Sequence, residues 1–427
     1  MSDIFPPFLQ RLFNNNKRVD KRLRKQRFPL FLAHYLAETV PLVKIAGTNG
    51  KGSVSSMLES CCLEDNKQVG LFTSPHLQCL SERIHIRGVA VELEMMESEA
   101  QILSHQIDEF VKQQGENYQL AFFECLLIIA LRLFKQAQVD IAIIEAGVGG
   151  YNDAVHFLDA DVSAITSLGL DHPQQLGHSL QSVATDKVGI ANANSTLIIS
   201  AAIDEDLQRL MEDDCKQRMI ELKIAAIDYS ELSQNLEGSQ FKLRLQNETL
   251  AIQLPLLGEF QLSNFAVVVS LWECLYSLKI VDRLSALQGV KNTVWAARME
   301  YFESNPSILF DVAHNPQALE ALNKTLDNLI PKARRVVLCG SSEDKDYPTS
   351  LKLFSSLSDN VYLCDGFYKA VSVNELQLQC PEAKACFRSP EQGLSYLQAH
   401  YAETDSCIIV AGSVFLVGAA RAVYLEN

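Results

Sequence analysis

The stretch from Val43 to Ser53, Val-Lys-Ile-Ala-Gly-Thr-Asn-Gly-Lys-Gly-Ser, constrains the fold of this 427-residue chain more than any other segment. A short apolar run leads into small, flexible residues, and apolar residues follow at helical spacing, which predicts a strand, a glycine-rich loop and a helix. Backbone N–H groups and the positive end of the helix then point at one place, where a phosphate can bind. Lys51 can neutralise phosphate oxygens, and the hydroxyl of Ser53 can reach a magnesium ion.

The strict Walker pattern fails in this loop, because Gly52 separates Lys51 from Ser53 and the upstream glycine is too close. A generic glycine-rich turn between a strand and a helix is the alternative. We favour a nucleotide site, because a lysine and a hydroxyl stand together at the start of the predicted helix.

Composition places the chain among globular proteins of two domains. Hydrophobic residues make up 48% and charged residues 21%, a balance that can bury a large core, and 427 residues exceed what one core usually organises. The net charge of −15 argues against a nucleic-acid partner, which needs a basic face. Eleven scattered cysteines without a CxxC pair are typical of a reducing compartment, and no apolar stretch is long enough to span a membrane. We therefore expect a cytoplasmic protein without a membrane partner.

Strands and helices alternate after the glycine-rich loop, which predicts a mostly parallel sheet with helices on both faces. Apolar runs end just before Ser74, at Glu145 and just before the segment that contains His172. Ligands gather outside the carboxyl ends of such strands, and these hydroxyl, carboxylate and imidazole groups are compatible with a divalent metal beside nucleotide phosphates. Each residue also has an ordinary structural explanation, Ser74 and His172 as turn residues and Glu145 as part of a salt bridge.

A second α/β pattern begins near residue 300, where Asp311 ends a predicted strand and His314 opens a predicted helix. We therefore predict an α/β protein in which a P-loop-type, mostly parallel sheet domain is followed by a smaller Rossmann-like α/β domain. The expected bounds are residues 1–292 for the first domain, 293–299 for a linker and 300–427 for the second domain. Residues 205–250 are more polar and less periodic, and they allow no clear prediction.

The segment from Lys17 to Arg27 is strongly basic within this acidic chain. We interpret it as the solvated face of a helix. Binding of a polyanionic substrate tail is the less favoured alternative.

Several motifs resemble those of the folylpolyglutamate synthase and dihydrofolate synthase family. They follow one another in the family's order from about residue 43 to residue 418, so they cover nearly the whole chain. They are Ala-Gly-Thr-Asn-Gly-Lys-Gly-Ser at 46–53, Thr-Ser-Pro-His-Leu at 73–77, Glu-Arg-Ile at 82–84, Phe-Phe-Glu at 122–124, Glu145 with Gly-Val-Gly-Gly at 147–150, Gly-Leu-Asp-His at 169–172, Asp-Lys-Val-Gly-Ile at 186–190, Asp-Val-Ala-His-Asn-Pro at 311–316, Asp-Lys-Asp at 344–346 and Gly-Ser at 412–413.

This resemblance implies an ATP-dependent amide ligase of the Mur ligase superfamily. Such enzymes phosphorylate a carboxylate with ATP, and the amine of glutamate then displaces phosphate from the acyl phosphate. A phosphate loop and a metal suit this chemistry, because both stabilise charge on the phosphoryl group in transfer.

The resemblance also implies a role for each matching residue, with two magnesium ions and a carbamylated lysine. The implied sets are Lys51, Lys187 and His314 as catalytic residues; Gly50, Lys51, Gly52, Ser53, Asn264, Arg298 and Asp311 at ATP; Ser74, Glu145, His172 and the carbamate of Lys187 at magnesium; and Ala121, Phe122, Phe123, Glu124, Asn152, Asp153 and Ala154 at the pteroate or folate.

The departures from the family pattern cluster on the pteroate side. The family's Gly-Gly-Arg-Leu-Asp-Ala-Thr-Asn segment is Gly-Gly-Tyr-Asn-Asp-Ala-Val-His here, at residues 149–156, and Ala121 stands where threonine is usual. Ala-Ala-Arg at 296–298 replaces Pro-Gly-Arg. Ligase chemistry is therefore a safer expectation than substrate identity.

We expect a monomeric ligase that joins L-glutamate to dihydropteroate, to folates, or to both, with ATP, glutamate and the pterin as its small-molecule partners. One alternative is a ligase with a changed pterin pocket that acts only on folylpolyglutamates or on another carboxylate. A second alternative, from another class, is a regulatory P-loop protein that binds a nucleotide without catalysis. Lys187, Asp311 and His314 argue against it, because nucleotide binding alone needs none of them.

Overall fold

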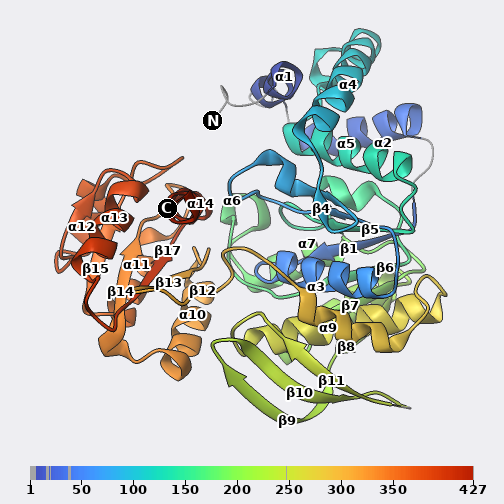
Figure 1. Ribbon diagram of the computed structural model, residues 1–427. Coiled ribbons are helices and arrows are strands. Elements are labelled where there is room, and N and C mark those ends of the chain that lie inside the picture. The colour runs from blue at the N-terminus through green and yellow to red at the C-terminus, as the bar shows by residue number, and fades with distance from the viewer. Residues whose placement is uncertain (1–5, 16–18, 20, 37–39, 247, 427) are drawn as a thin grey trace. The chain divides into compact units, whose positions relative to one another are not determined.

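The computed structural model describes residues 6–15, 19, 21–36, 40–246 and 248–426. The chain divides into two compact units (Figure 1). The first contains Met1–Ile227 and Ser263–Val290, and the second contains Asp228–Leu262 and Lys291–Asn427. Residues 228–262 thus group with the C-terminal part of the chain, and the linker expected at residues 293–299 stays a prediction. No helix of the described part is long and apolar enough to cross a membrane.

The first unit is built on an eight-stranded sheet of order β4-β3-β2-β5-β1-β6-β7-β8. The strands from β2 to β8 in this order run parallel, and β3 and β4 add antiparallel pairs at one edge. The strands are β1 (Leu42–Ala46), β2 (Val69–Phe72), β3 (Ile84–Ile86), β4 (Val89–Ala90), β5 (Ile141–Glu145), β6 (Val162–Ile165), β7 (Thr196–Ser200) and β8 (Glu221–Ala225).

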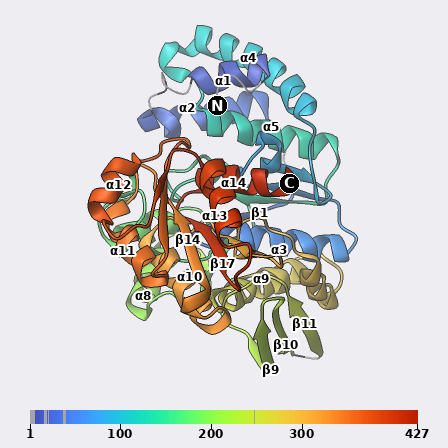
Figure 2. The ribbon, with the colours of Figure 1, turned by 60° about the vertical axis from the view of Figure 1, so that its left-hand side comes forward.

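Helices cover both faces of this sheet, as the sequence predicted. In Figures 1 and 2, α3 and α9 lie on one side of the sheet and α5 on the other. Because both faces are covered, every residue of β1 and β5 is buried. The helices are α1 (Pro7–Asn15), α2 (Arg24–Tyr35), α3 (Lys51–Glu64), α4 (Leu93–Gln114), α5 (Phe122–Gln136), α6 (Pro173–Leu176), α7 (Leu180–Val188), α8 (Glu205–Gln217) and α9 (Phe260–Ser277), with the short 3₁₀ helix η6 (Ala154–Phe157).

The strand order places a topological switch between β1 and β6. From β1 the chain passes through α3 to β2, on one side of β1, whereas from β6 it passes to β7 on the other side. Connections that leave neighbouring strands in opposite directions open a crevice outside the carboxyl ends of those strands. The glycine-rich loop at residues 47–50 follows β1, so it lies at this switch.

The second unit contains a six-stranded sheet of order β12-β13-β17-β14-β15-β16, in which only β12 pairs antiparallel. Figure 2 shows β14 beside β17, to which it pairs. Its elements are β12 (Glu300–Phe302), β13 (Ser307–Phe310), α10 (Pro316–Leu329), β14 (Arg335–Cys339), α11 (Tyr347–Leu357), β15 (Val361–Cys364), α12 (Val373–Gln379), β16 (Cys386–Phe387), α13 (Pro390–His400), β17 (Cys407–Ala411) and α14 (Val414–Glu426).

A three-stranded antiparallel sheet of order β11-β10-β9 also belongs to the second unit, and the sequence analysis did not predict it. Its strands are β9 (Asp228–Asn235), β10 (Gly238–Arg244) and β11 (Thr249–Leu254). Buried and exposed residues alternate along β10 and β11, with Phe241 and Leu243 facing Leu250 and Ile252. This period of two is the signal that the polar composition of the region concealed.

Candidate active site

The segment after β6 holds the glycine-rich loop in place. The N–H groups of Thr48 and Asn49 donate to the carbonyl and the hydroxyl of Ser167, at 3.0 and 2.9 Å. The hydroxyl of Thr166 donates to the carbonyl of Asn49 at 2.6 Å. The sequence analysis missed Thr166 and Ser167. Their position directly after a buried strand, at the edge where the loop also lies, is the signal that could have identified them.

The helix α3 begins at Lys51, directly after Gly50, whose φ of 86° lies in the left-handed region. The ammonium of Lys51 donates to the carbonyls of Gly47 and Thr48, at 3.1 and 3.3 Å. Ser53 is buried in the first turn of the helix. The predicted strand, loop and helix are therefore present, with the start of a long helix directed at the loop as anion binding requires.

Asn264 of α9 packs against this loop, and Gly50 leaves the space for it. A β-carbon at position 50 would lie 2.5 Å from Oδ1 of Asn264. The sequence analysis placed both residues at ATP. Their contact brings these two predicted site residues together within the first unit.

Replacing Gly50 with alanine is expected to weaken binding of an ATP analogue by about tenfold or more. The left-handed conformation costs a residue with a β-carbon about 1–2 kcal/mol, and the clash with Asn264 adds to this cost. Isothermal titration calorimetry with a non-hydrolysable analogue measures the effect. Gly115 provides the control, because it has a φ of 109° but no atom within 4 Å of the position that a β-carbon would take. Equal affinities for the wild type and Gly50→Ala would contradict the nucleotide assignment.

Glu145, Ser74 and Lys51 lie close together. Oε2 of Glu145 accepts a hydrogen bond from the N–H of Ser74 at 3.0 Å, and Oε1 lies 3.9 Å from Nζ of Lys51. Glu145 is buried at the carboxyl end of β5, as predicted. These contacts put a carboxylate and a hydroxyl-bearing residue beside the lysine of the glycine-rich loop.

His172 lies on the segment that follows β6. Its backbone N–H donates to Oδ1 of Asp171 at 2.9 Å, and Nε2 of its imidazole lies 3.8 Å from Oδ2 of the same aspartate. The segment is joined to the glycine-rich loop through Thr48, whose hydroxyl accepts from the N–H of Gly169 at 3.0 Å and donates to its carbonyl at 3.1 Å. These bonds bring the segment of His172 to the loop that carries Lys51.

The residues around Glu145 fit a hard divalent cation in part. Among the described residues, no group of three or more His, Cys, Asp or Glu side chains is arranged to hold a metal ion. Magnesium, however, often takes only one or two carboxylates and completes its shell with water and substrate phosphates. The oxygen donors of Glu145 and Ser74 meet this requirement.

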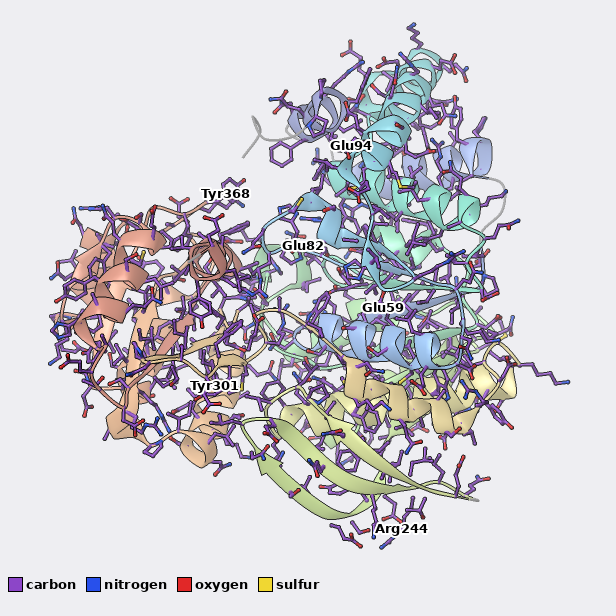
Figure 3. The ribbon with its side chains drawn as sticks, in the orientation of Figure 1. Glu59, Glu82, Glu94, Arg244, Tyr301 and Tyr368 are labelled. Carbon is purple, nitrogen blue, oxygen red and sulfur yellow. The ribbon has the colours of Figure 1, made fainter. Side chains whose placement is uncertain are left out.

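A second carboxylate shapes the segment that contains Ser74. Glu82, labelled in Figure 3, accepts hydrogen bonds from the N–H groups of Leu77, Gln78 and Cys79, at 2.7, 2.9 and 2.6 Å. The sequence analysis matched residues 82–84 to the family without a role. The structure shows that Glu82 holds the turn after β2.

The neighbouring Arg83 donates through Nε to Nδ1 of His76 at 3.0 Å. Burial and then the charge of Arg83 lower the pKa of His76 to about 4, so the imidazole is neutral and can accept this bond. Burial also lowers the pKa of Arg83 to about 10, against the opposing charge of Glu145. Arg83 is therefore a half-buried cation that interacts with Glu145 and that the sequence analysis did not select.

Lys187 is not a surface lysine. It lies in the last turn of α7 and is 2% exposed. Burial, and then the charge of Lys51, lower its pKa to about 7, while Asp186, Asp153 and Asp171 act in the opposite direction. With this pKa, the amine is uncharged in about half of the protein molecules at pH 7.

The acceptor loop, which we define as residues 147–154, is attached to the helix of Lys187. Asp186 accepts from the N–H of Gly150 at 2.8 Å and from Nδ2 of Asn152 at 2.6 Å. The asparagine that replaces the family's leucine at position 152 therefore has a polar partner. Tyr151, which replaces the family's arginine, is exposed, and its ring centroid lies 3.5 Å from Nζ of Lys25.

The acceptor loop also meets the aromatic segment, which we define as residues 121–124. A β-carbon at Gly147 would lie 3.1 Å from the ring of Phe123 and 3.3 Å from Oδ2 of Asp153. The carboxylate of Asp153 accepts from the N–H groups of Val148 and Val155, at 3.0 and 2.9 Å. Phe123 and Asp153, which the sequence analysis assigned to the pteroate, are thus neighbours.

Glu124 is fully buried, and its carboxylate is occupied by the protein itself. Oε2 accepts from the N–H of Ala121 at 2.8 Å, and Arg24 and Arg27 donate to the carboxylate as well. The interpretation of the basic run as a solvated helix face was therefore wrong for Arg27, which is buried, and for Arg24, which is 15% exposed. Lys17 and Arg18 of that run lie outside the described residues.

The remaining predicted residues form a cluster in the second unit. Asp311 is buried directly after β13 and accepts from the N–H groups of Met299 and Ala313, both at 2.8 Å. Burial raises the pKa of its carboxyl, and the charges of Arg298 and His314 oppose this effect. Arg298 is half-buried, and its guanidinium lies 6.0 Å from the ring centroid of Trp295.

Two domain families match the chain. The Mur ligase middle domain matches residues 45–272, and the glutamate ligase domain of Mur ligases matches residues 297–414. A probable bifunctional folylpolyglutamate synthase/dihydropteroate synthase of Halobacterium salinarum is 28% identical over 393 residues, which cover 89% of this chain and 46% of that protein. This chain spans about half the length of that relative and of the similar protein of Haloferax volcanii.

The dihydrofolate synthase/folylpolyglutamate synthase of Escherichia coli K12 is 31% identical over 320 residues, which cover 74% of this chain and 71% of that protein. Escherichia coli FolC in complex with DHPP and ADP superposes with a TM-score of 0.79 at 26% identity, over 94% of this chain and 93% of that one. A bifunctional folylpolyglutamate synthase/dihydrofolate synthase with Mn, AMPPNP and L-glutamate bound has a TM-score of 0.78 at 26% identity, over 94% of both chains. The chain therefore belongs to the dihydrofolate synthase/folylpolyglutamate synthase family of Mur ligases.

Proposed function

We propose that the protein is an ATP-dependent ligase that adds L-glutamate to dihydropteroate, to folates, or to both. One observation supports this proposal above the others: Lys51 and Glu145 lie together at the carboxyl edge of one sheet, and the charge of Lys51 also acts on the buried Lys187. Catalysis of phosphoryl transfer needs positive charge and positioning at one point. The family members named above bind ADP, DHPP, AMPPNP and L-glutamate, which are nucleotides and substrates of this class.

The reaction proceeds in two transfers. The carboxylate of the acceptor attacks the γ-phosphorus of ATP, which forms an acyl phosphate and releases ADP. The amine of glutamate then attacks the acyl carbon, loses a proton and expels phosphate, so that an amide bond remains. Lys51 stabilises the negative charge that develops on the transferred phosphoryl group. The hydroxyl of Ser53 and the start of α3 orient the nucleotide.

We propose that magnesium binds at this site. Ser74, Glu145 and His172 are proposed to hold it together with phosphate oxygens and water, and it supplies charge that neutralises the phosphates when bound. We further propose that the neutral amine of Lys187 attacks carbon dioxide and loses a proton, which leaves a carbamate. This anion is suited to a second magnesium ion.

The rest of the ATP site stays a proposal. We assign Asn264 to it, since this residue packs on Gly50, and we assign Arg298 and Asp311 by resemblance. His314 is proposed to act at the glutamate and the phosphate. We further propose that the enzyme is a monomer and that it works in the cytoplasm.

The proposed function allows two acceptors, dihydropteroate and folylpolyglutamates. Phe123 and Asp153 meet at Gly147, which supports retention of a pterin pocket, whereas the Tyr151-Asn152 replacement alters the adjoining loop. We favour dihydropteroate as an acceptor, and a folylpolyglutamate-only ligase is the alternative.

The test measures ATP-dependent phosphate release with glutamate and either dihydropteroate or tetrahydrofolate. We expect both acceptors to give phosphate and a glutamylated product that mass spectrometry identifies. Product from tetrahydrofolate alone would show that the dihydrofolate synthase half of the proposal is wrong. Nucleotide binding without glutamate-dependent phosphate release from either acceptor would support the regulatory P-loop alternative.

A further inference from the structure

A buried cluster of one carboxylate and two arginines lies beside the aromatic segment. Nη2 of Arg27 donates to both oxygens of Glu124, at 2.9 and 3.1 Å, and neither side chain is exposed. Nε of Arg24 donates to Oε1 of the same carboxylate at 2.7 Å. The cluster therefore joins the start of α2 to the start of α5.

The guanidinium of Arg24 makes a further bond, to the acceptor loop. Its Nη1 donates to the carbonyl of Asn152 in the acceptor loop. One guanidinium thus contacts both the aromatic segment, through Glu124, and the acceptor loop, through Asn152. Asn152 is in turn bound to Asp186, so the same loop is held from two directions.

Stability alone is a weak reason for this arrangement. Buried ion clusters cost desolvation energy, and replacing them with well-packed apolar side chains often leaves a protein as stable or more stable. The first turn of α2 also has basic residues and no acidic one, which the helix dipole disfavours. What an apolar cluster could not supply is a directional link between Glu124 and a backbone carbonyl of the loop.

We propose that Arg24 is a positioning residue that sets the aromatic segment and the acceptor loop at the separation the pterin acceptor requires. This inference rests on the proposed function, because the acceptor is the ligand that both segments are assigned to contact. Arg24 acts through its contacts with Glu124 and Asn152. Its planar fork of donors can bond in two directions at once, which the ammonium of lysine cannot do with the same geometry.

The test compares steady-state kinetics of Arg24→Ala, Arg24→Lys and the wild type in the full chain, with dihydropteroate and tetrahydrofolate. In both variants we expect the KM for the acceptor to rise by about tenfold or more, the usual effect of losing a hydrogen bond to a charged group. The kcat and the KM for ATP should stay within about twofold of the wild type, because no contact of Arg24 reaches the glycine-rich loop. Free guanidinium at millimolar concentration should partly restore the acceptor KM of Arg24→Ala.

Arg11 provides the matched control. It also links an N-terminal helix to another element, through a 2.7 Å ion pair with Asp108, but it is exposed and its partner lies on α4 rather than in either segment. Arg11→Ala should keep the wild-type acceptor KM and show no response to guanidinium. If Arg24→Ala fails to fold, Arg24→Lys decides the question alone.

Three outcomes would overturn the inference. They are an unchanged acceptor KM in a folded Arg24 variant, a loss of kcat without a change in any KM, and a guanidinium effect that is equal in Arg11→Ala. Failure of the proposed function is a separate result, since the wild type itself would then form no product with either acceptor.

Discussion

Replacing Lys51 with alanine is expected to lower kcat/KM for ligation by about a hundred- to a thousandfold. Removing one preorganised group that stabilises developing charge has an effect of this size in other enzymes. Lys51 is the first residue of α3, and its ammonium lies 3.1 Å from the carbonyl of Gly47 and 3.9 Å from Glu145. In the alanine variant the helix start remains but the ammonium charge is gone, so nucleotide binding should weaken less than turnover.

Initial rates of phosphate release over a range of ATP concentrations measure both kcat/KM and the turnover at saturating ATP, and circular dichroism confirms that the variant is folded. Lys67 is a suitable control, because it follows the same helix and forms a surface ion pair of 2.8 Å with Asp282. We expect Lys67→Ala to retain wild-type turnover. Wild-type turnover of Lys51→Ala would exclude the assignment of the loop to the phosphates.

Replacing Lys187 with alanine is expected to lower kcat by about a hundredfold or more, with partial recovery when a small carboxylate such as acetate is added. A fall in kcat of this size is expected when one group that stabilises the transition state electrostatically is removed. The recovery follows because the proposed carbamate is an anion, and a small carboxylate can occupy the space that the buried side chain leaves.

The chemistry of this lysine predicts a pH dependence. Only a neutral amine attacks carbon dioxide, and an ordinary lysine with a pKa of 10.5 is neutral in about one molecule in three thousand at pH 7. The pKa of Lys187 is lowered to about 7, so about half of its amines are neutral at that pH. The carbamate should therefore form readily above pH 7 and be lost as the pH falls below about 6.

Carbon-13 NMR of protein equilibrated with labelled bicarbonate measures this carbamate directly, without reference to activity. Lys44 is an internal control, because burial lowers its pKa to about 7 as well. Its Nζ already donates to the carbonyl of Leu158 at 2.9 Å and to Oδ1 of Asn192 at 2.6 Å, and these hydrogen bonds oppose its modification. We expect a carbamate signal that Lys187→Ala abolishes and Lys44→Met retains. Absence of the signal from both the wild type and Lys44→Met would contradict carbamylation of Lys187.

Local patterns in the sequence determined much of the fold. Short apolar runs between polar turns marked β1, β5 and β13, and the small residues before Lys51 marked a loop that leads into a helix. The same patterns placed Glu145 and Asp311 at strand ends. These features can be predicted from the sequence because each depends on residues only a few positions apart, which share one face of a strand or of a helix. The sheet of β9, β10 and β11 escaped prediction because its surface is largely polar.

Contacts between distant segments were decided only by the tertiary structure. Ser167 holds Thr48 and Asn49 because β6 lies beside β1, and nothing local in the sequence states that order. Arg24 and Glu124 are 100 residues apart, so a run of basic residues was interpreted as solvated although part of it is buried.

The depressed pKa of Lys187 has the same origin. It arises from burial and from the charge of Lys51, which is 136 positions away in the chain. The sequence by itself therefore determined which chemical groups the protein possesses and at which strand ends several of them stand. Only the packing of the sheet decided which of them become neighbours and which lose water, because desolvation and Coulomb interactions depend on distance in space and not along the chain.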